Sequence, residues 1–302
     1  MTNVRPCPIC SGAANGAAFP FSTEWNGKRF SYVRCAGCAT TFVDPSPDEE
    51  DFAKMYSKAN YHDEHYSVVA VEQYRQSIRI LKGLVGDKVS LLDFGCGNGS
   101  FISAGKQEGL YCVGVEMDAD TIRFAQANSG CLVLTLDALK QSGRLFDVIH
   151  LGDVLEHLPQ PADLLRDLES LLRPGGMFFV EGPLENNPSA VYTTARLFAW
   201  GAALLGRRKA GHHAPTHLFR VDASNQRAFF VGRMKYRERH FAVYETGWPY
   251  YNADEPFRLA PGFIVKSTIG LIAVALGGAR APSGGRFGNR FSGLFVAKGP
   301  ST

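Results

Sequence analysis

Two pairs of cysteines near the N-terminus have the spacing of a metal site. Cys7 and Cys10 form one CxxC pair, and Cys35 and Cys38 form a second after a loop of 24 residues that contains an expected hairpin. Proline or glycine inside each pair helps the backbone turn so that both sulfurs point inward. Four thiolates close a tetrahedral zinc site of the structural kind. Disulfide pairing is the alternative, and it is disfavoured because the N-terminus lacks the pattern of an export signal.

A glycine-rich turn over residues 91–100, LLDFGCGNGS, is a candidate ligand site. Asp93 ends an expected strand, and glycines in the turn before the next helix let the backbone pass beneath a ligand where a Cβ would clash. Glu116 ends the following strand, where a carboxylate can accept both hydrogen bonds of a ribose diol. Ser100 stands where a dinucleotide fingerprint requires glycine, which disfavours a dehydrogenase. The glycines of the turn are Gly95, Gly97 and Gly99.

Further motifs follow in a fixed order: GVEMD, the acidic Asp137 after a third expected strand, FDVIHLGDVLEHLPQP and LLRPGGMFFVEGP. In this order and spacing, residues 88–183 resemble class I S-adenosylmethionine-dependent methyltransferases, including those of ubiquinone biosynthesis and of sugar modification. The resemblance implies S-adenosylmethionine as cofactor and S-adenosylhomocysteine as product. It also implies a Rossmann-like sheet of seven strands, mostly parallel, with an antiparallel last strand.

The resemblance implies four groups of cofactor-binding residues. The first holds the methionine moiety, the second binds the ribose hydroxyls and packs on adenine, the third reads the adenine edge, and the fourth borders the sulfonium. This assignment suits methyl transfer, an in-line displacement that depends on the alignment of nucleophile, methyl and sulfur. In that order the groups are Asp93, Gly95, Cys96, Gly97 and Gly99; Glu116 and Met117; Asp137 and Ala138; and Gly152 and Asp153.

Histidines are the candidates for a general base, because imidazole can accept a hydroxyl proton near neutral pH. We rank His217 first, since its segment APTHLFRVDASN resembles the cap that many of these enzymes place over the acceptor. His157, in DVLEHL, ranks second, with a purely structural hydrogen bond as its alternative. His212 and His213 are also candidates, or simply a surface turn. Methyl transfer driven by proximity alone, without a base, is the remaining alternative.

The rest of the chain predicts an α/β protein. Short apolar runs alternate with helical segments between about residues 90 and 182, the pattern of βαβ units and a parallel sheet. Two later strands are expected, in KYRERHFAVYE and SGLFVAKG. We expect three domains: a zinc ribbon over 1–45, a helical cap or linker over 46–86, and a methyltransferase domain over 87–300 with a cap insertion at about 184–232.

Composition limits the partners. The chain has 302 residues, 45% of them hydrophobic, and a net charge of +3 without a run of five or six like charges, so the composition argues against nucleic acid as a partner. The apolar run 263–276 is interrupted by Lys266 and is too short to span a membrane. This run and LFAWGAALLGRRK leave peripheral membrane contact as an alternative to core packing. We expect a cytoplasmic protein without a transmembrane segment.

The sequence therefore predicts a zinc-containing methyltransferase that acts on a small-molecule or sugar-type acceptor, with O-methylation as the preferred reaction. Two alternatives stay open. One is an RNA-binding or RNA-modifying methyltransferase that uses the ribbon as a reader, and the other is a non-catalytic scaffold that binds the cofactor. The acceptor and the oligomeric state are not determined by the sequence.

Overall fold

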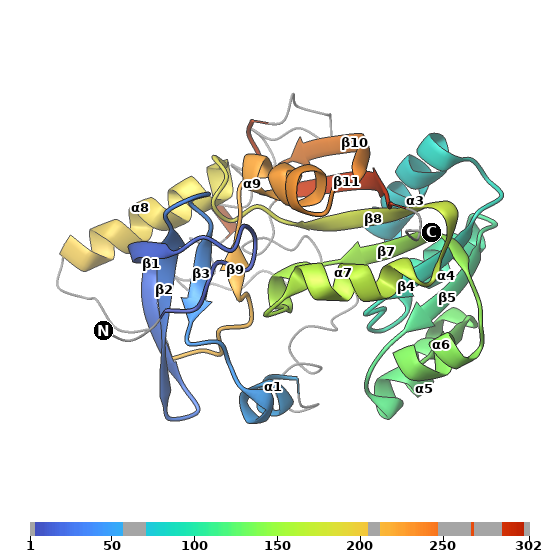
Figure 1. Cartoon of the computed structure of the whole chain (residues 1–302), viewed down its shortest axis with the longest axis horizontal. Helices are drawn as coiled ribbons and strands as arrows, with labels where there is room; N and C mark the ends of the chain where they lie inside the picture. Colours follow the sequence, from blue (N-terminus) through green and yellow to red (C-terminus); the bar gives the residue numbers. More distant parts are fainter. Residues whose placement is uncertain (1–3, 57–70, 205–211, 247–266, 269–285, 299–302) are drawn as a thin grey trace.

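The computed structural model describes residues 4–56, 71–204, 212–246, 267–268 and 286–298. Within these ranges the chain forms two sheets, one of seven strands and one of four (Figure 1). The seven-stranded sheet has helices on both faces, and the four-stranded sheet lies at the other end of the molecule with the N-terminus.

The large sheet has the strand order β10-β11-β8-β7-β4-β5-β6. The pairs within β8-β7-β4-β5-β6 are parallel, whereas β11 is antiparallel to both of its neighbours. This arrangement confirms the predicted α/β fold with a mostly parallel seven-stranded sheet and an antiparallel last strand. The strands are β4 (Ser90–Phe94), β5 (Tyr111–Val115), β6 (Leu132–Leu134), β7 (Phe146–Gly152), β8 (Leu172–Pro183), β10 (Arg237–Tyr244) and β11 (Arg290–Val296).

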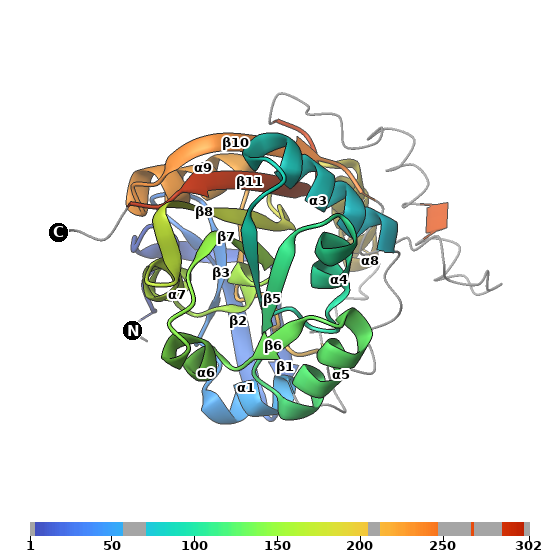
Figure 2. The same cartoon turned by 90° about the vertical axis from the view of Figure 1, so that its right-hand side faces the viewer.

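Helices cover the two faces of this sheet because its buried strands are apolar on both sides. Leu91 packs into one hydrophobic cluster with Ile78 of α3, while the adjacent Leu92 packs into a second with Leu165 of α7. Figure 2 shows the sheet between these two groups of helices. The first group is α3 (Val71–Val85), α4 (Ser100–Gln107) and α5 (Ala119–Ser129), and the second is α6 (Leu136–Gln141) and α7 (Pro161–Glu169).

β8 begins before the Pro-Gly-Gly sequence of the motif LLRPGGMFFVEGP. α7 ends at Glu169, and β8 already begins at Leu172. Leu172 already pairs with Phe146 of β7, and Gly175 supplies a left-handed φ of 78° inside the strand. Pairing with a neighbouring strand therefore outweighs the local turn signal of the Pro-Gly-Gly sequence.

The N-terminal sheet contains the predicted hairpin and one strand that was not predicted there. Thr41 of β3 pairs antiparallel with Arg220 of β9, and the Val43 amide donates to the Leu218 carbonyl at 2.9 Å. The small N-terminal module is thus completed by a strand from far along the chain. Its strands are β1 (Ala14–Trp25), β2 (Lys28–Cys35), β3 (Thr41–Asp44) and β9 (Phe219–Arg220).

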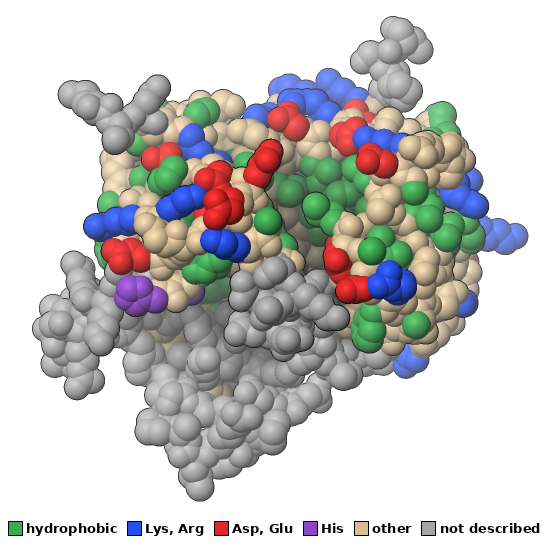
Figure 3. All heavy atoms as spheres, turned by 90° about the horizontal axis from the view of Figure 1, so that it is seen from below, with side chains coloured by type: hydrophobic (Ala, Val, Ile, Leu, Met, Phe, Trp, Pro, Cys, Tyr) green, Lys and Arg blue, Asp and Glu red, His purple; other side chains and the backbone are tan. Residues whose placement is uncertain are grey.

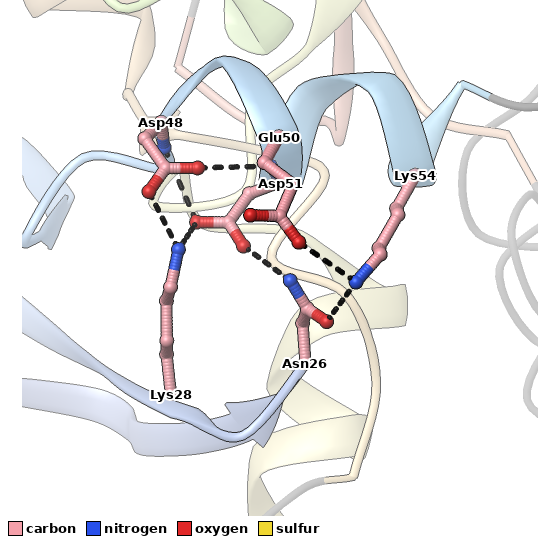
Figure 4. Close-up of polar contacts among 6 residues, drawn as sticks. All are labelled: Asn26, Lys28, Asp48, Glu50, Asp51 and Lys54. Carbon is pink, nitrogen blue, oxygen red and sulfur yellow. Dashed lines mark hydrogen bonds and ion pairs between the residues drawn. The ribbon is translucent and has the colours of Figure 1, made fainter.

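The tip of the β1–β2 hairpin is bound to α1 (Glu49–Met55) by a polar cluster (Figure 4). Asp51, with 1% of its side chain exposed, accepts hydrogen bonds from Asn26 at 2.8 Å and from the Lys28 ammonium at 2.9 Å. Lys28 also contacts Asp48, the residue that caps the N-terminus of α1. The cluster fixes the hairpin against the helix that follows the ribbon.

The remaining helical elements lie between β7 and β10. They are the 3₁₀ turn η2 (Leu155–His157), α8 (Ala190–Leu204), α9 (Ala223–Arg227) and the π-helix η3 (Ala228–Arg233). The apolar run at 263–276 falls, apart from two residues, outside the described ranges. None of the described helices combines the length and the apolar character that crossing a bilayer requires.

Candidate active site

The glycine turn between β4 and α4 has the backbone conformation that the sequence predicts. Gly95, Gly97 and Gly99 all have positive φ, at 71°, 52° and 78°. At Gly99, which begins α4, a Cβ would lie 2.9 Å from the Ala125 carbonyl oxygen of α5. Both the left-handed backbone and this close approach require glycine at position 99.

Glu116 follows β5 and lies beside the glycine turn. Its carboxylate accepts hydrogen bonds from the Gly97 amide at 3.0 Å and the Met117 amide at 2.8 Å. Met117 itself is 90% exposed, as expected of a side chain that is available to cover a flat ligand. The residues assigned to the methionine, ribose and adenine groups thus follow adjacent parallel strands.

The other assigned cofactor residues follow β6 and β7. Asp137 is exposed in the first turn of α6, and its neighbour Ala138 donates its amide to Thr135, which caps the helix. Asp137 is therefore not the capping residue. Asp153, after Gly152, has a left-handed φ of 53° and forms an ion pair with Arg290 of β11 at 2.8 Å. Desolvation opposes ionisation, but Arg290 holds the pKa of Asp153 below its usual value.

His217 forms a dyad with a carboxylate that the sequence analysis did not single out. Its Nδ1 lies 3.1 Å from Glu185 Oε2, and Arg220 Nε lies 3.4 Å from the same oxygen. Burial alone lowers the pKa of His217, but Glu185 outweighs it and raises the pKa overall. Desolvation opposes the ionisation of Glu185 too, yet Arg220 and His217 bring its pKa down to about 2. The dyad therefore contains an ionised carboxylate beside a basic imidazole.

His157 lies against His217 but has a different environment. The two rings meet edge to face with centroids 4.9 Å apart, and His157 Nδ1 lies 2.9 Å from the Thr216 carbonyl oxygen. A carbonyl only accepts, so Nδ1 carries the proton. Burial, with a further contribution from His217, lowers the pKa of His157 to about 3. His157 is therefore a neutral ring across the physiological pH range.

Glu156 is a third polar side chain beside His157 and His217, and it was not singled out from the sequence. Its carboxylate and the rings of His157 and His217 each place one polar atom within 4.8 Å of the others. Burial, followed by the charge of Asp153, raises the pKa of Glu156 to about 8, so this buried acid is mostly protonated at neutral pH. The motif DVLEHL contained it, but only the fold shows that it faces the histidines.

The structure separates the other two histidines from this group. His212 and His213 are exposed, and the backbone of His213 exchanges hydrogen bonds with Thr23 of β1. They lie beside the ribbon, as the surface-turn alternative predicts.

Seen from below, the molecule has a hollow between two masses, with hydrophobic side chains on its wall and acidic side chains at its rim (Figure 3).

The four N-terminal cysteines converge. Cys7 Sγ lies 3.8 Å from Cys38 Sγ, Cys10 Sγ lies 3.4 Å from Cys35 Sγ, and all four sulfurs lie within 4.8 Å of one another. None of the described cysteines forms a disulfide. Tetrahedral Zn–S bonds of about 2.3 Å separate the sulfurs by about 3.8 Å, so this donor set fits a zinc ion.

The two CxxC pairs have matching backbones. The Ser11 amide donates to the Cys7 carbonyl at 2.8 Å, and the Ala39 amide donates to the Cys35 carbonyl at 3.0 Å. Ser11 and Ala39, each directly after a pair, have left-handed φ values of 64° and 60°. Two such turns with the same geometry direct the sulfurs to one point, as a closed structural metal site requires.

Comparison with known proteins decides the family. A family model described as a methyltransferase domain matches residues 72–225, just over half of the chain. The chain belongs to this methyltransferase family. The match includes the glycine turn, Glu116, Asp137 and His217, and it confirms the predicted class I methyltransferase.

Named relatives of this methyltransferase include two ubiquinone biosynthesis O-methyltransferases. The chain is 34% identical over 116 residues to the one from Pseudomonas aeruginosa (strain LESB58), which is 36% of this chain and 49% of that protein. It therefore spans about half the length of that relative. It is 27% identical over 191 residues to the one from Pectobacterium atrosepticum, which is 60% of this chain and 73% of that protein.

Solved structures give weaker likenesses. The plantazolicin methyltransferase BpumL in complex with SAH has a TM-score of 0.48 and 14% identity, covering 83% of this chain and 92% of that one. A SAM-dependent methyltransferase from Archaeoglobus fulgidus has a TM-score of 0.43 and 19% identity, with 75% and 94% coverage.

Replacing Gly99 by alanine tests the construction of the glycine turn. We expect Gly99→Ala to lower the free energy of unfolding by ~1–3 kcal/mol, because it combines a left-handed backbone with a clash against Ala125. Gly83→Ala is the matched control, since that glycine is exposed in α3 with nothing within 4 Å of an added Cβ, and alanine there should stabilise by ~0.5–1 kcal/mol. Urea denaturation measures both, and an equal effect of the two substitutions would contradict this construction.

Proposed function

We propose that this methyltransferase transfers the methyl group of S-adenosylmethionine to an oxygen of a small-molecule or sugar-type acceptor, with S-adenosylhomocysteine as product. The observation that carries the proposal is the positive-φ glycine turn together with the Glu116 carboxylate fixed beside it. Family membership supports the reaction class. The relatives named as O-methyltransferases support oxygen as the methylated atom.

The residues at this edge fit the cofactor. We propose that Asp93 and the turn from Gly95 to Gly99, including Cys96, hold the methionine moiety, and that Glu116 binds the ribose hydroxyls. Met117, Asp137 and Ala138 would contact adenine, and Gly152 and Asp153 would border the sulfur. When bound, the cofactor supplies an electrophilic methyl group on a positively charged sulfur. Carboxylates around the site suit that charge.

His217 is our proposed general base. A base needs a lone pair toward the acceptor and a group that orients its other nitrogen. Glu185 is ionised and lies at Nδ1, so this nitrogen carries the proton and Nε2 is left to accept one from an acceptor hydroxyl. The raised pKa makes His217 a stronger base than a solvent-exposed histidine.

His157 suits a positioning role better than catalysis. Its low pKa makes it a weak proton acceptor, and its edge-to-face contact holds the ring of His217. We propose that Glu156, as a buried neutral acid, donates a hydrogen bond within the same group. In this assignment His217 accepts the proton, Glu156 donates a hydrogen bond, and His157 positions the ring of His217.

We further propose that Cys7, Cys10, Cys35 and Cys38 bind one structural Zn²⁺. Cys7 and Cys35 are buried within the main hydrophobic core, and Arg233 of η3 donates to the carbonyls of Pro8 and Ile9 at 2.7 and 3.0 Å. The module therefore packs directly on the methyltransferase domain. Because β3 pairs with β9, which begins two residues after His217, the ribbon also holds the segment that carries the proposed base.

A reader of RNA is less well supported than this structural role. Lys28, one of the few basic residues of the ribbon, contacts Asp48 and Asp51, so its charge is already compensated within the molecule. An RNA substrate would appear as salt-sensitive binding that Cys35→Ser abolishes. A non-catalytic scaffold would bind the cofactor without any turnover.

The proposed base is tested with an acceptor found by screening nucleotide sugars and hydroxylated phenols for release of S-adenosylhomocysteine. His217→Asn should lower kcat about 10²–10⁴-fold, whereas His157→Asn should act mainly through the position of His217 and have a smaller effect. Because the base acts when neutral, kcat should rise with pH through an apparent pKa above 6.5. Glu185→Gln should move that rise to lower pH. Unchanged kcat in His217→Asn would show that proximity alone drives the reaction.

Zinc is tested by metal analysis of the purified chain. We expect about one zinc per wild-type chain, its loss in Cys35→Ser, and its retention in Cys131→Ser, because Cys131 is a half-buried cysteine outside the cluster. Cys35→Ser should also lower kcat, since the ribbon holds the His217 segment. A wild-type chain that binds no zinc, or zinc that survives in Cys35→Ser, would contradict the assignment.

A further inference from the structure

A buried row of three ionisable side chains, Asp93, His150 and Glu181, lies beside the glycine turn. His150 of β7 lies opposite Asp93 of β4 in the strand register, and its Nδ1 lies 2.7 Å from Asp93 Oδ1. On the other side of the ring, Nε2 lies 3.5 Å from Oε2 of Glu181 on β8. All three residues are less than a tenth exposed. One imidazole therefore lies between two carboxylates that are more than nine-tenths buried.

Two helices, α3 and α4, contact this row. Ser77 of α3 donates to Glu181 Oε1 at 3.0 Å, which connects the row to the helix that precedes the sheet. Phe101 of α4 stacks on the His150 ring, with centroids 3.7 Å apart and planes at 15°. The imidazole thus contacts β4, β8 and α4 directly, and its orientation is fixed by packing as well as by polar contacts.

Gly152 is part of the same arrangement. It lies two residues after His150 on β7, hence on the same face of the strand. A Cβ at Gly152 would lie 2.7 Å from Cε1 of the His150 ring. Gly152, which the family resemblance places at the border of the sulfonium, therefore makes room for the imidazole because it has no side chain.

The ring carries a positive charge at neutral pH. Burial alone lowers the pKa of His150, but Asp93 and Glu181 outweigh it and raise the pKa to about 9. Two other titratable groups lie near the row, Tyr74 on α3 and Cys96 in the turn. Burial, with Asp93 adding to it, raises the pKa of the Cys96 thiol, and burial with nearby carboxylates raises that of Tyr74 to about 12, so both stay neutral through pH 9. Arg290, the nearby cation, is already paired with Asp153.

We propose that His150 is a positioning residue for the cofactor, which holds the Asp93 carboxylate from below in the orientation that receives the methionine end of S-adenosylmethionine. This inference rests on the proposed function, since it deepens the role of Asp93 at that site. A charged imidazole carries a proton on both nitrogens. Nδ1 holds the Asp93 carboxylate at 2.7 Å, while the charge on the ring attracts Glu181 at 3.5 Å from Nε2 and so anchors the imidazole to β8.

The pH dependence follows from the sign of the shift. Because the pKa of His150 is raised above that of a free histidine, its contribution is fully present below about pH 6.5 and is lost as the pH rises through about 9. Above that value the ring is neutral and keeps a proton on only one nitrogen, so it no longer attracts both carboxylates, and Glu181 keeps the hydrogen bond from Ser77. Affinity for the cofactor should therefore fall in the alkaline direction.

Calorimetric titration with S-adenosylhomocysteine between pH 6.5 and 10 tests the proposal. We expect His150→Gln, which removes the charge, to weaken binding about tenfold at pH 7 and to abolish the step near pH 9 that the wild type shows. Glu181→Gln keeps an amide partner for Ser77 and should move the step to lower pH. His240→Gln, in a half-buried histidine on β10 away from the row, is the matched control and should leave both affinity and step unchanged.

The possible outcomes distinguish a failure of the proposed function from a failure of the role proposed for His150. A wild type that binds no S-adenosylhomocysteine overturns the proposed function and this inference with it. Wild-type binding that is matched by His150→Gln, in affinity and in pH profile, overturns the inference alone, even if the variant melts at a lower temperature. If His150→Gln does not fold, nitrogen NMR of the wild-type ring and the profile of Glu181→Gln decide: a ring that loses its proton near pH 6.5 overturns the proposal.

Discussion

The site depends on the parallel pairing of β4, β5 and β7. Parallel strands end at one edge of a sheet, so residues that are distant in sequence arrive together once the register is set. The register pairs Asp93 with His150 and Gly152 with Glu181. A shift by a single residue would turn each of these side chains to the opposite face. The position of the glycine turn, the buried row beside it and the location of Glu116 after β5 all follow from this one constraint.

The position of the His217 segment depends on β9. This strand is only two residues long, yet it joins that segment to the N-terminal sheet, whose strand β2 ends at Cys35. Asn186 adds a hydrogen bond to Thr41 of β3 and another to the Arg220 carbonyl. Under the proposed function, the N-terminal module thereby positions the segment that carries His217.

Much of this could be predicted from the sequence, because the informative motifs are local. The glycine turn, the acid after the next strand and the CxxC pairs each lie within a few residues, and their spacing determines their geometry. In the sequence, His150 is one residue of an expected buried strand, FDVIHL, and nothing nearby indicates a role for it. Only the strand register shows that it lies between Asp93 and Glu181. Glu185 is 32 residues from His217 and belongs to no motif. The domain boundaries stay predictions. β9, from the expected insertion at about 184–232, pairs with β3 of the N-terminal module, so one sheet contains residues of two expected domains.

Calorimetric titration of the zinc-loaded wild-type chain with S-adenosylmethionine and with NAD tests the central claim most directly. Both ligands contain an adenosine with a ribose diol, so they differ at the groups that the glycine turn has to accommodate. We predict a dissociation constant on the order of 1–100 μM for S-adenosylmethionine and no binding of NAD. Binding of NAD, or no binding of S-adenosylmethionine, would contradict the account.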